Sequence, residues 1–218
     1  MNIQEYIISD VTPLKMDDDV QQAQKLFQQL TFSHIPVMDQ ELYQGCVSET
    51  DVYCFEDGQS LRDVKYALDT FMVQPDTHWL DVLEAFAQHN SNVMPVLNDK
   101  NEYLGYYELK DIMQHFSDSP FLYESGAVIV VEKGSTDYSF SEIAQIVESN
   151  DCKIYGCFVS NYRDHITEIT IKVSPDNLNA LLQTFRRYSY TVVSAAEDDS
   201  YLDALKERSD YLDKYLNI

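Results

Sequence analysis

Residues 33–51 read SHIPVMDQELYQGCVSETD, and this stretch decides the fold because a version of it returns later in the chain. Residues 92–111 read NVMPVLNDKNEYLGYYELKD, so Pro36 and Pro95 both precede a valine and stand 59 positions apart. A proline inside a short apolar stretch is unusual for a strand unless the strand lies at an edge. Its return at the matching place indicates a repeated structural unit.

The repeat extends to both sides of the two prolines. Gly45 and Gly105 recur 60 positions apart, because one residue is inserted between proline and glycine in the second copy. Upstream of each proline, residues 17–30 and 76–89 carry apolar residues at helical spacing. We expect each copy to run helix, short strand, turn, strand and helix. A unit of about 60 residues buries little apolar surface alone, so the two copies should pack together.

In both copies the apolar-Pro-Val segment is followed, beyond a turn, by a glycine and by an aspartate six positions later. This pattern resembles that of CBS domains, which come in tandem pairs called Bateman modules. The resemblance covers roughly residues 1–117, with the first repeat over 1–60 and the second over 61–117. The segments that carry it are Ile35-Pro36-Val37 with Gly45-Cys46-Val47-Ser48-Glu49-Thr50-Asp51, and Met94-Pro95-Val96 with Gly105-Tyr106-Tyr107-Glu108-Leu109-Lys110-Asp111.

The resemblance implies that clefts of the pair bind a small adenosine-containing ligand, namely AMP, ADP, ATP or S-adenosylmethionine, and that no cofactor is required. Asp51 would accept hydrogen bonds from ribose hydroxyls, a task that suits an ionised carboxylate. Ser48 would donate to a phosphate or to ribose, aided by the N-terminus of the following helix. Ile35 and Pro36 would form an apolar wall against adenine.

Further candidates come from the entry to the first copy and from the second copy. Thr12 could touch the base or the ribose, and a protonated His34 could face a phosphate. The second copy has Glu108 where the first has Ser48, and a carboxylate repels a phosphate. We therefore expect the second cleft to be weak, empty or suited to an uncharged or cationic ligand. Its candidate residues are Met94, Pro95 and Asp111.

The same residues have a purely structural interpretation. Asp51 and Asp111 could cap helices, and Ser48 could satisfy its own backbone. His34 could equally be a structural or surface histidine. The sequence leaves these alternatives open beside nucleotide binding.

The second half of the chain follows a different pattern. Residues 117–125 break the repeat with serine, aspartate and proline, and 126–197 then predict the order β-α-β-β-α-β, a ferredoxin-like arrangement. Its second helix is expected to start at Ser174, because Pro175 suits the first helical position. The fold class is therefore α+β, a tandem CBS pair followed by a ferredoxin-like domain.

Residues 126–197 resemble an ACT domain, a family that often binds amino acids or other small effectors at dimer interfaces. The resemblance rests on layout, since Tyr138 stands where ACT domains commonly carry a glycine. Gly134 and Asp137 are the candidate effector contacts, with an ordinary turn as the alternative. Residues 200–218 predict a C-terminal helix with a short leucine seam at heptad spacing, which suggests a role between subunits.

The composition restricts the class of partner. Fifteen lysines and arginines against 37 aspartates and glutamates give a net charge of -22, which argues against a nucleic-acid polymer as partner. The start MNIQEYIISD does not resemble a signal peptide, and no run of about 18 apolar residues occurs. We expect a cytoplasmic protein with no membrane partner.

Catalytic and metal-binding motifs are absent from the sequence. It contains no P-loop, G-x-S-x-G, H-E-x-x-H or G-x-G-x-x-G, and its four cysteines lack C-x2-C spacing. The domain order resembles that of acetoin-utilisation accessory proteins. We expect a non-catalytic regulatory sensor without a metal site, assembled as a homodimer that could act on a protein partner. The alternative is a ligand-free dimerisation and interaction scaffold.

Overall fold

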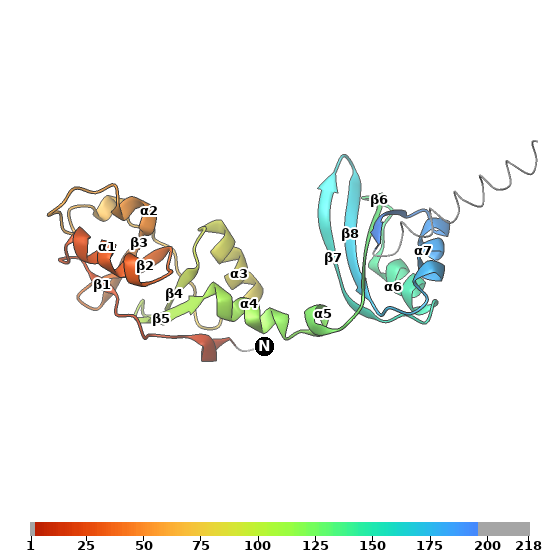
Figure 1. Cartoon of the computed structure of the whole chain (residues 1–218), viewed down its shortest axis with the longest axis horizontal. Helices are drawn as coiled ribbons and strands as arrows, with labels where there is room; N and C mark the ends of the chain where they lie inside the picture. The colour runs from red at the N-terminus through yellow and green to blue at the C-terminus, as the bar shows by residue number, and fades with distance from the viewer. Residues whose placement is uncertain (1–2, 196–218) are drawn as a thin grey trace, which may run out of the picture. The chain divides into compact units, whose positions relative to one another are not determined.

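The sequence repeat becomes two matching runs of helix, strand, strand and helix (Figure 1). The computed structural model describes residues 3–195, and the chain divides into two units, Met1–Ser117 and Asp118–Ile218. The chain is mixed α+β, as expected. The helix expected over 200–218 lies outside the described residues. Within 3–195, no helix has both the length and the apolar character needed to cross a bilayer.

Unit 1 contains both copies of the repeat. The first copy carries a three-stranded sheet in the order β1-β2-β3, and the second pairs β4 with β5. A short extended segment, called here the lead-in, precedes each copy: residues 8–15 and residues 69–73. The elements are η1 (Gln4–Tyr6), β1 (Leu14–Lys15), α1 (Val20–Gln29), β2 (His34–Asp39), β3 (Leu42–Ser48), α2 (Glu49–Val52), η2 (Lys65–Ala67), α3 (Trp79–Gln88), β4 (Val93–Leu97), β5 (Tyr103–Glu108) and α4 (Leu109–Ser117).

Local sequence explains how these elements begin. Asp19 caps α1, because its side chain accepts a hydrogen bond from the backbone N–H of Gln21 at 2.8 Å.

Pro36 can lie inside the central strand β2 because β1 pairs only with the next two residues, Val37 and Met38. The missing N–H of the proline is therefore not needed by a neighbouring strand on that side.

Each lead-in pairs first with the other copy. Ile8 exchanges two backbone hydrogen bonds with Tyr106, at 3.0 and 2.9 Å. Asp69 does the same with Cys46, at 2.9 and 2.8 Å. Each segment then returns to its own copy, where Leu14 aligns with Val37 and Val73 with Val96. The lead-ins thus cross between the copies and hold them together.

Residues at matching positions of the two copies touch one another. Ser33 and Asn92 exchange hydrogen bonds, with Ser33 N–H donating to Asn92 Oδ1 at 2.8 Å and Asn92 N–H to Ser33 Oγ at 3.0 Å. The rings of Tyr43 and Tyr103 stack with centroids 6.4 Å apart. Contacts between equivalent residues are the mark of an isologous interface. The copies are therefore related by an approximate two-fold axis.

Each copy has its own apolar core. In α1 the predicted face is buried at Val20, Ala23 and Phe27, and in α3 it is buried at Val82 and Phe86. The core of the first copy comprises Leu14, Met16, Val20, Ala23, Phe27, Ile35, Val37, Val47, Val52, Leu61 and Val64. The core around the second comprises Ile3, Cys46, Phe71, Val73, Val82, Phe86, Met94, Val96, Tyr107 and Ile112.

The two repeated glycines lie where the lead-ins cross. Gly45 and Gly105 have φ values of +136° and +142°, a region that side chains of other residues rarely adopt. A Cβ at Gly45 would lie 2.9 Å from the carbonyl oxygen of Asp69, and one at Gly105 would lie still closer to that of Ile8. Glycine therefore recurs because the other copy's backbone occupies the space of a side chain.

Unit 2 has the element order β-α-β-β-α-β that the sequence indicates, preceded by a short helix. Its four-stranded sheet has the order β7-β8-β6-β9, and α6 and α7 cover the same face of it (Figure 1). In β8, Thr167, Ile169, Ile171 and Val173 point into the core. The elements are α5 (Pro120–Tyr123), β6 (Ala127–Gly134), α6 (Phe140–Glu148), β7 (Ile154–Arg163), β8 (Ile166–Val173), α7 (Leu178–Arg187) and β9 (Thr191–Ala195).

The expected start of the second helix of unit 2 is wrong. Helix α7 begins at Leu178 after Asn177, which adopts a left-handed conformation with φ of 52°. Ser174 does not cap the helix, because its hydroxyl accepts a hydrogen bond from the backbone N–H of Lys153 at 3.0 Å. Ser174 therefore makes a hydrogen bond to a distant part of the chain and does not serve as the expected N-cap of the helix.

We expect Gly105→Ala to lower the free energy of unfolding by about 2–4 kcal/mol, because steric overlap and backbone strain add. Gly45→Ala should also destabilise unit 1. Gly58→Ala is the matched control, since Gly58 has φ of +84° but open space around it and should cost about 1–2 kcal/mol. Urea unfolding followed by fluorescence of the single tryptophan, Trp79, measures the differences. Equal losses for Gly58 and Gly105 would contradict the steric explanation.

Candidate functional site

The crossing lead-ins create two junctions in unit 1, each built from both copies. The first junction comprises His34, Ser48 and Asp51 of the first copy with Asp69, Phe71 and His89 of the second. The second junction comprises Asp10, Thr12 and α1 of the first copy with Tyr106 and Glu108 of the second. The two junctions are built from equivalent positions of the repeat, because Phe71 stands 59 positions after Thr12 and His89 stands 59 positions after Leu30.

Ser48 and Asp51 lie together at the end of β3, as the sequence indicated. The Ser48 hydroxyl donates a hydrogen bond to Asp51 Oδ2 at 2.8 Å and accepts one from the backbone N–H of Asp51 at 3.0 Å. Ser48 thereby caps α2, a helix of four residues. The pair is satisfied internally, in keeping with its structural interpretation, while Asp51 stays partly exposed with its Oδ1 still able to accept hydrogen bonds.

His34 is buried beside this pair rather than facing solvent. Its Nδ1 lies 2.9 Å from the hydroxyl of Ser33, and its Nε2 lies 3.4 Å from a carboxylate oxygen of Asp69. Burial lowers the pKa of His34 below its usual value, although the carboxylates of Asp69 and Asp51 act in the opposite direction. The imidazole is therefore neutral near pH 7 and carries no charge for a phosphate.

An aromatic pair fills the first junction. The rings of Phe71 and His89 stack with centroids 4.5 Å apart, and His34 meets the edge of Phe71 at 5.3 Å. Phe71 is 4% exposed, whereas His89 is exposed and lies over it. His34 was among the sequence candidates, whereas Phe71, His89 and Asp69 were missed. Extending the comparison of the copies into the lead-ins would have aligned Asp69 with Asp10 and Phe71 with Thr12.

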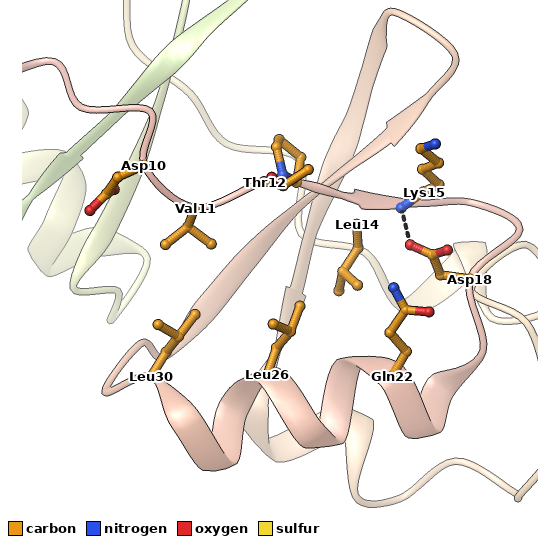
Figure 2. A pocket seen from close by; sticks show the side chains of 10 residues that line it. Asp10, Val11, Thr12, Leu14, Lys15, Asp18, Gln22, Leu26 and Leu30 are labelled. Carbon is orange, nitrogen blue, oxygen red and sulfur yellow. Dashed lines mark hydrogen bonds between the residues drawn. The ribbon is translucent and has the colours of Figure 1, made fainter.

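Thr12 lies at the second junction. It borders a cavity of about 430 Å³ between the first lead-in and α1 (Figure 2). Figure 2 shows Gln22 and Leu26 of α1, and Leu30 directly after it, pointing toward that segment. The lining residues are Asp10, Val11, Thr12, Pro13, Leu14, Lys15, Asp18, Gln22, Leu26 and Leu30.

Polar groups beside this cavity are mostly anionic. The Tyr106 hydroxyl donates to Asp10 Oδ1 at 2.6 Å, and burial together with the charges of Asp10 and Glu108 raises the pKa of Tyr106. Lys110 forms an ion pair with Glu108 at 2.6 Å, which raises the pKa of the lysine. The carboxylate of Glu108 is thus compensated by its own neighbour. Asp111 lies in the first turn of α4 and is half-buried.

The apolar candidates are core residues in this structure. Ile35 and Met94 have no exposed surface, and each belongs to the core of its own copy. Pro36 and Pro95 are buried in the middle of β2 and β4. These four buried side chains therefore do not form an open wall against adenine.

The effector candidates of unit 2 form a tight turn. The carbonyl of Gly134 accepts hydrogen bonds from the backbone N–H groups of Asp137 at 2.8 Å and Tyr138 at 3.2 Å. The side chain of Asp137 folds back against Gly134 and is exposed. Among the described residues, no group of three His, Cys, Asp or Glu side chains is placed to hold a metal ion.

Comparison with known proteins concerns the first half of the chain. The CBS domain family model matches residues 3–55 and 61–118, the two copies of the repeat. The curated relatives include inosine-5'-monophosphate dehydrogenases. The protein from Korarchaeum cryptofilum is 27% identical over 107 residues and that from Methanocaldococcus jannaschii 28% identical over 112 residues. These matches span 49% and 50% of this chain but only 22% of each dehydrogenase.

Solved structures with a similar fold also align with about half of the chain. A CBS domain pair/ACT domain protein from Thermotoga maritima is 17% identical with a TM-score of 0.48, and the match covers 53% of this chain and 96% of that protein. CBSX2, solved in complex with AMP, is 15% identical with a TM-score of 0.45, covering 53% of this chain and 95% of that protein.

We expect His34→Val to weaken the pH dependence of stability between pH 7 and 5. A histidine with a lowered folded pKa binds protons preferentially in the unfolded state as the pH falls below about 6.5, so the free energy of unfolding decreases. Valine is the matched replacement because Val93 holds the equivalent buried position in the second copy. Urea unfolding at several pH values measures the slope. Identical slopes for the wild type and the variant would show that the pKa of His34 is the same in the folded and unfolded states.

Proposed function

The chain belongs to the CBS domain family, and from this we propose that it is a non-catalytic regulatory sensor that binds an adenosine-containing ligand in its CBS pair. The ligand class comprises AMP, ADP, ATP and S-adenosylmethionine. We further propose a cytoplasmic homodimer in which an ACT-like unit 2 takes a second effector near Gly134 and Asp137 and in which the signal reaches a protein partner.

One observation carries the proposal. A hydroxyl and a partly exposed carboxylate, those of Ser48 and Asp51, stand where β3 meets α2, just after Cys46, which pairs with Asp69 in the lead-in of the other copy. A carboxylate with a free oxygen can accept hydrogen bonds from ribose hydroxyls, and Asp51 offers its Oδ1 while its Oδ2 is held by Ser48. The family resemblance implies that residues at these two positions contact the ribose.

Adenine has a matching apolar surface at the same junction. Phe71 is a buried ring whose outward face is covered by the exposed His89. We propose that adenine replaces His89 in this stack, because aromatic rings favour offset stacking on one another. His89 lies just after the end of α3, as its C-cap residue, so its side chain can turn outward without breaking the helix.

A scaffold without ligand is the second candidate, and the same geometry favours it in one respect. Ser48 and Asp51 already satisfy each other, and Phe71 with His89 already fills the junction. If the scaffold is correct, no adenosine compound will raise the melting temperature, while light scattering will still report a dimer. A monomeric mass at working concentration would contradict the dimer in both candidates.

We expect Asp51→Asn to weaken binding of an adenosine ligand by about tenfold to a hundredfold, because a hydrogen bond to a charged group is lost. Asparagine keeps an acceptor for Ser48, so the cap should survive. Asp111→Asn is the matched control at the second copy and should leave that affinity unchanged. Calorimetry gives the affinities, and a ligand at about 100 times its dissociation constant should stabilise the wild type by about 2.7 kcal/mol. A loss equal in both variants would contradict the assignment to the first junction.

A further inference from the structure

Phosphate groups find no favourable partner at the first junction. We propose that this junction selects adenosine compounds that carry no phosphate, with a neutral or cationic 5′ substituent. The inference rests on the proposed function, since it assumes that an adenosine compound binds beside Asp51. It narrows the ligand class from nucleotides in general to nucleosides and their sulfonium derivatives.

The charged side chains at the first junction are carboxylates. The Asp69 carboxylate lies 3.4 Å from His34 Nε2, and the charge of Asp51 also acts on this imidazole. Glu49 and Asp51 also occupy the first turn of α2. Each phosphate added to a ligand would bring more negative charge toward this set, so the repulsion grows with the number of phosphates.

Groups that usually bind phosphate are already engaged or absent here. The Ser48 hydroxyl donates to Asp51, and the buried His34 is neutral and contacts Ser33 and Asp69. Helix α2 has only four residues, so its N-terminus offers little dipole for an anion. His89 is the one further imidazole of the junction, and the proposed adenine displaces it.

Lysine and arginine side chains lie elsewhere in unit 1. The unit carries six of them against twenty carboxylates. Arg62 is held by Asp17 and Asp39, Lys65 by Gln44, Lys110 by Glu108, and Lys15 borders the cavity at the second junction. Lys25 is exposed on α1, and Lys100 lies in the turn between β4 and β5. None of the described interactions links any of the six to His34, Ser48 or Asp51.

Calorimetry without magnesium tests the selection with adenosine, AMP and ATP on the full chain. We expect ATP to bind at least about tenfold more weakly than adenosine, a difference of about 1.4 kcal/mol. S-Adenosylmethionine should bind more tightly than S-adenosylhomocysteine, which lacks one methyl group and the sulfonium charge. ATP binding as tightly as adenosine, or tighter, would overturn the inference while leaving the proposed function intact. No binding of any adenosine compound would defeat the proposed function itself.

Asp69→Asn tests the cause of the selection. Its side chain is 52% exposed and its backbone makes the contact with Cys46, so the fold should tolerate the change, which a melting curve verifies. The variant should reduce the ratio of the adenosine and AMP affinities by at least about threefold, because one carboxylate of this set is neutralised. Asp10→Asn, at the equivalent position of the second junction, should leave the ratio unchanged. An unchanged ratio in Asp69→Asn would overturn the electrostatic explanation.

Discussion

Two reciprocal pairs of backbone hydrogen bonds hold unit 1 together. Cys46 in β3 pairs with Asp69, and Tyr106 in β5 pairs with Ile8. The last strand of each copy is therefore bordered by the lead-in of the other copy. Either copy alone would leave that strand with an uncovered edge and a small core, which is unfavourable for a unit of about 60 residues. The crossing solves both problems, and it requires glycine at positions 45 and 105, where the incoming backbone leaves no room for a side chain.

The crossing also explains why neither junction belongs to one copy. The first combines the Ser48 and Asp51 pair with Phe71 and His89, while the second combines the first lead-in with Tyr106 and Glu108. Substitutions at matching positions then make the junctions different. Where the second junction has Thr12 and Leu30 around an open cavity, the first has an aromatic stack. An approximate two-fold scaffold thus carries two chemically distinct sites.

Much of the fold follows from the sequence, because periodicity is a local property. Val20, Ala23 and Phe27 predict the buried face of α1, and the alternation of Ile169, Ile171 and Val173 predicts that of β8. The crossing could not be predicted in this way, since an extended segment carries no signal for which strand it will join. The cavity that Thr12 borders, between the first lead-in and α1, could therefore not be predicted from its local sequence. Ser174 shows the same limit, because its hydroxyl serves Lys153 in the folded unit instead of a helix end.

A ligand at the first junction would contact groups from both copies, and this determines how it could act as a signal. A ligand shifts a conformational equilibrium only by its difference in affinity for the two states. A site contained within one copy would bind alike however the copies were arranged. Here Asp51 comes from the first copy, whereas Asp69 and Phe71 enter with the second, so the distances between them depend on the crossing. Binding energy at this junction would therefore be coupled to the arrangement of the copies.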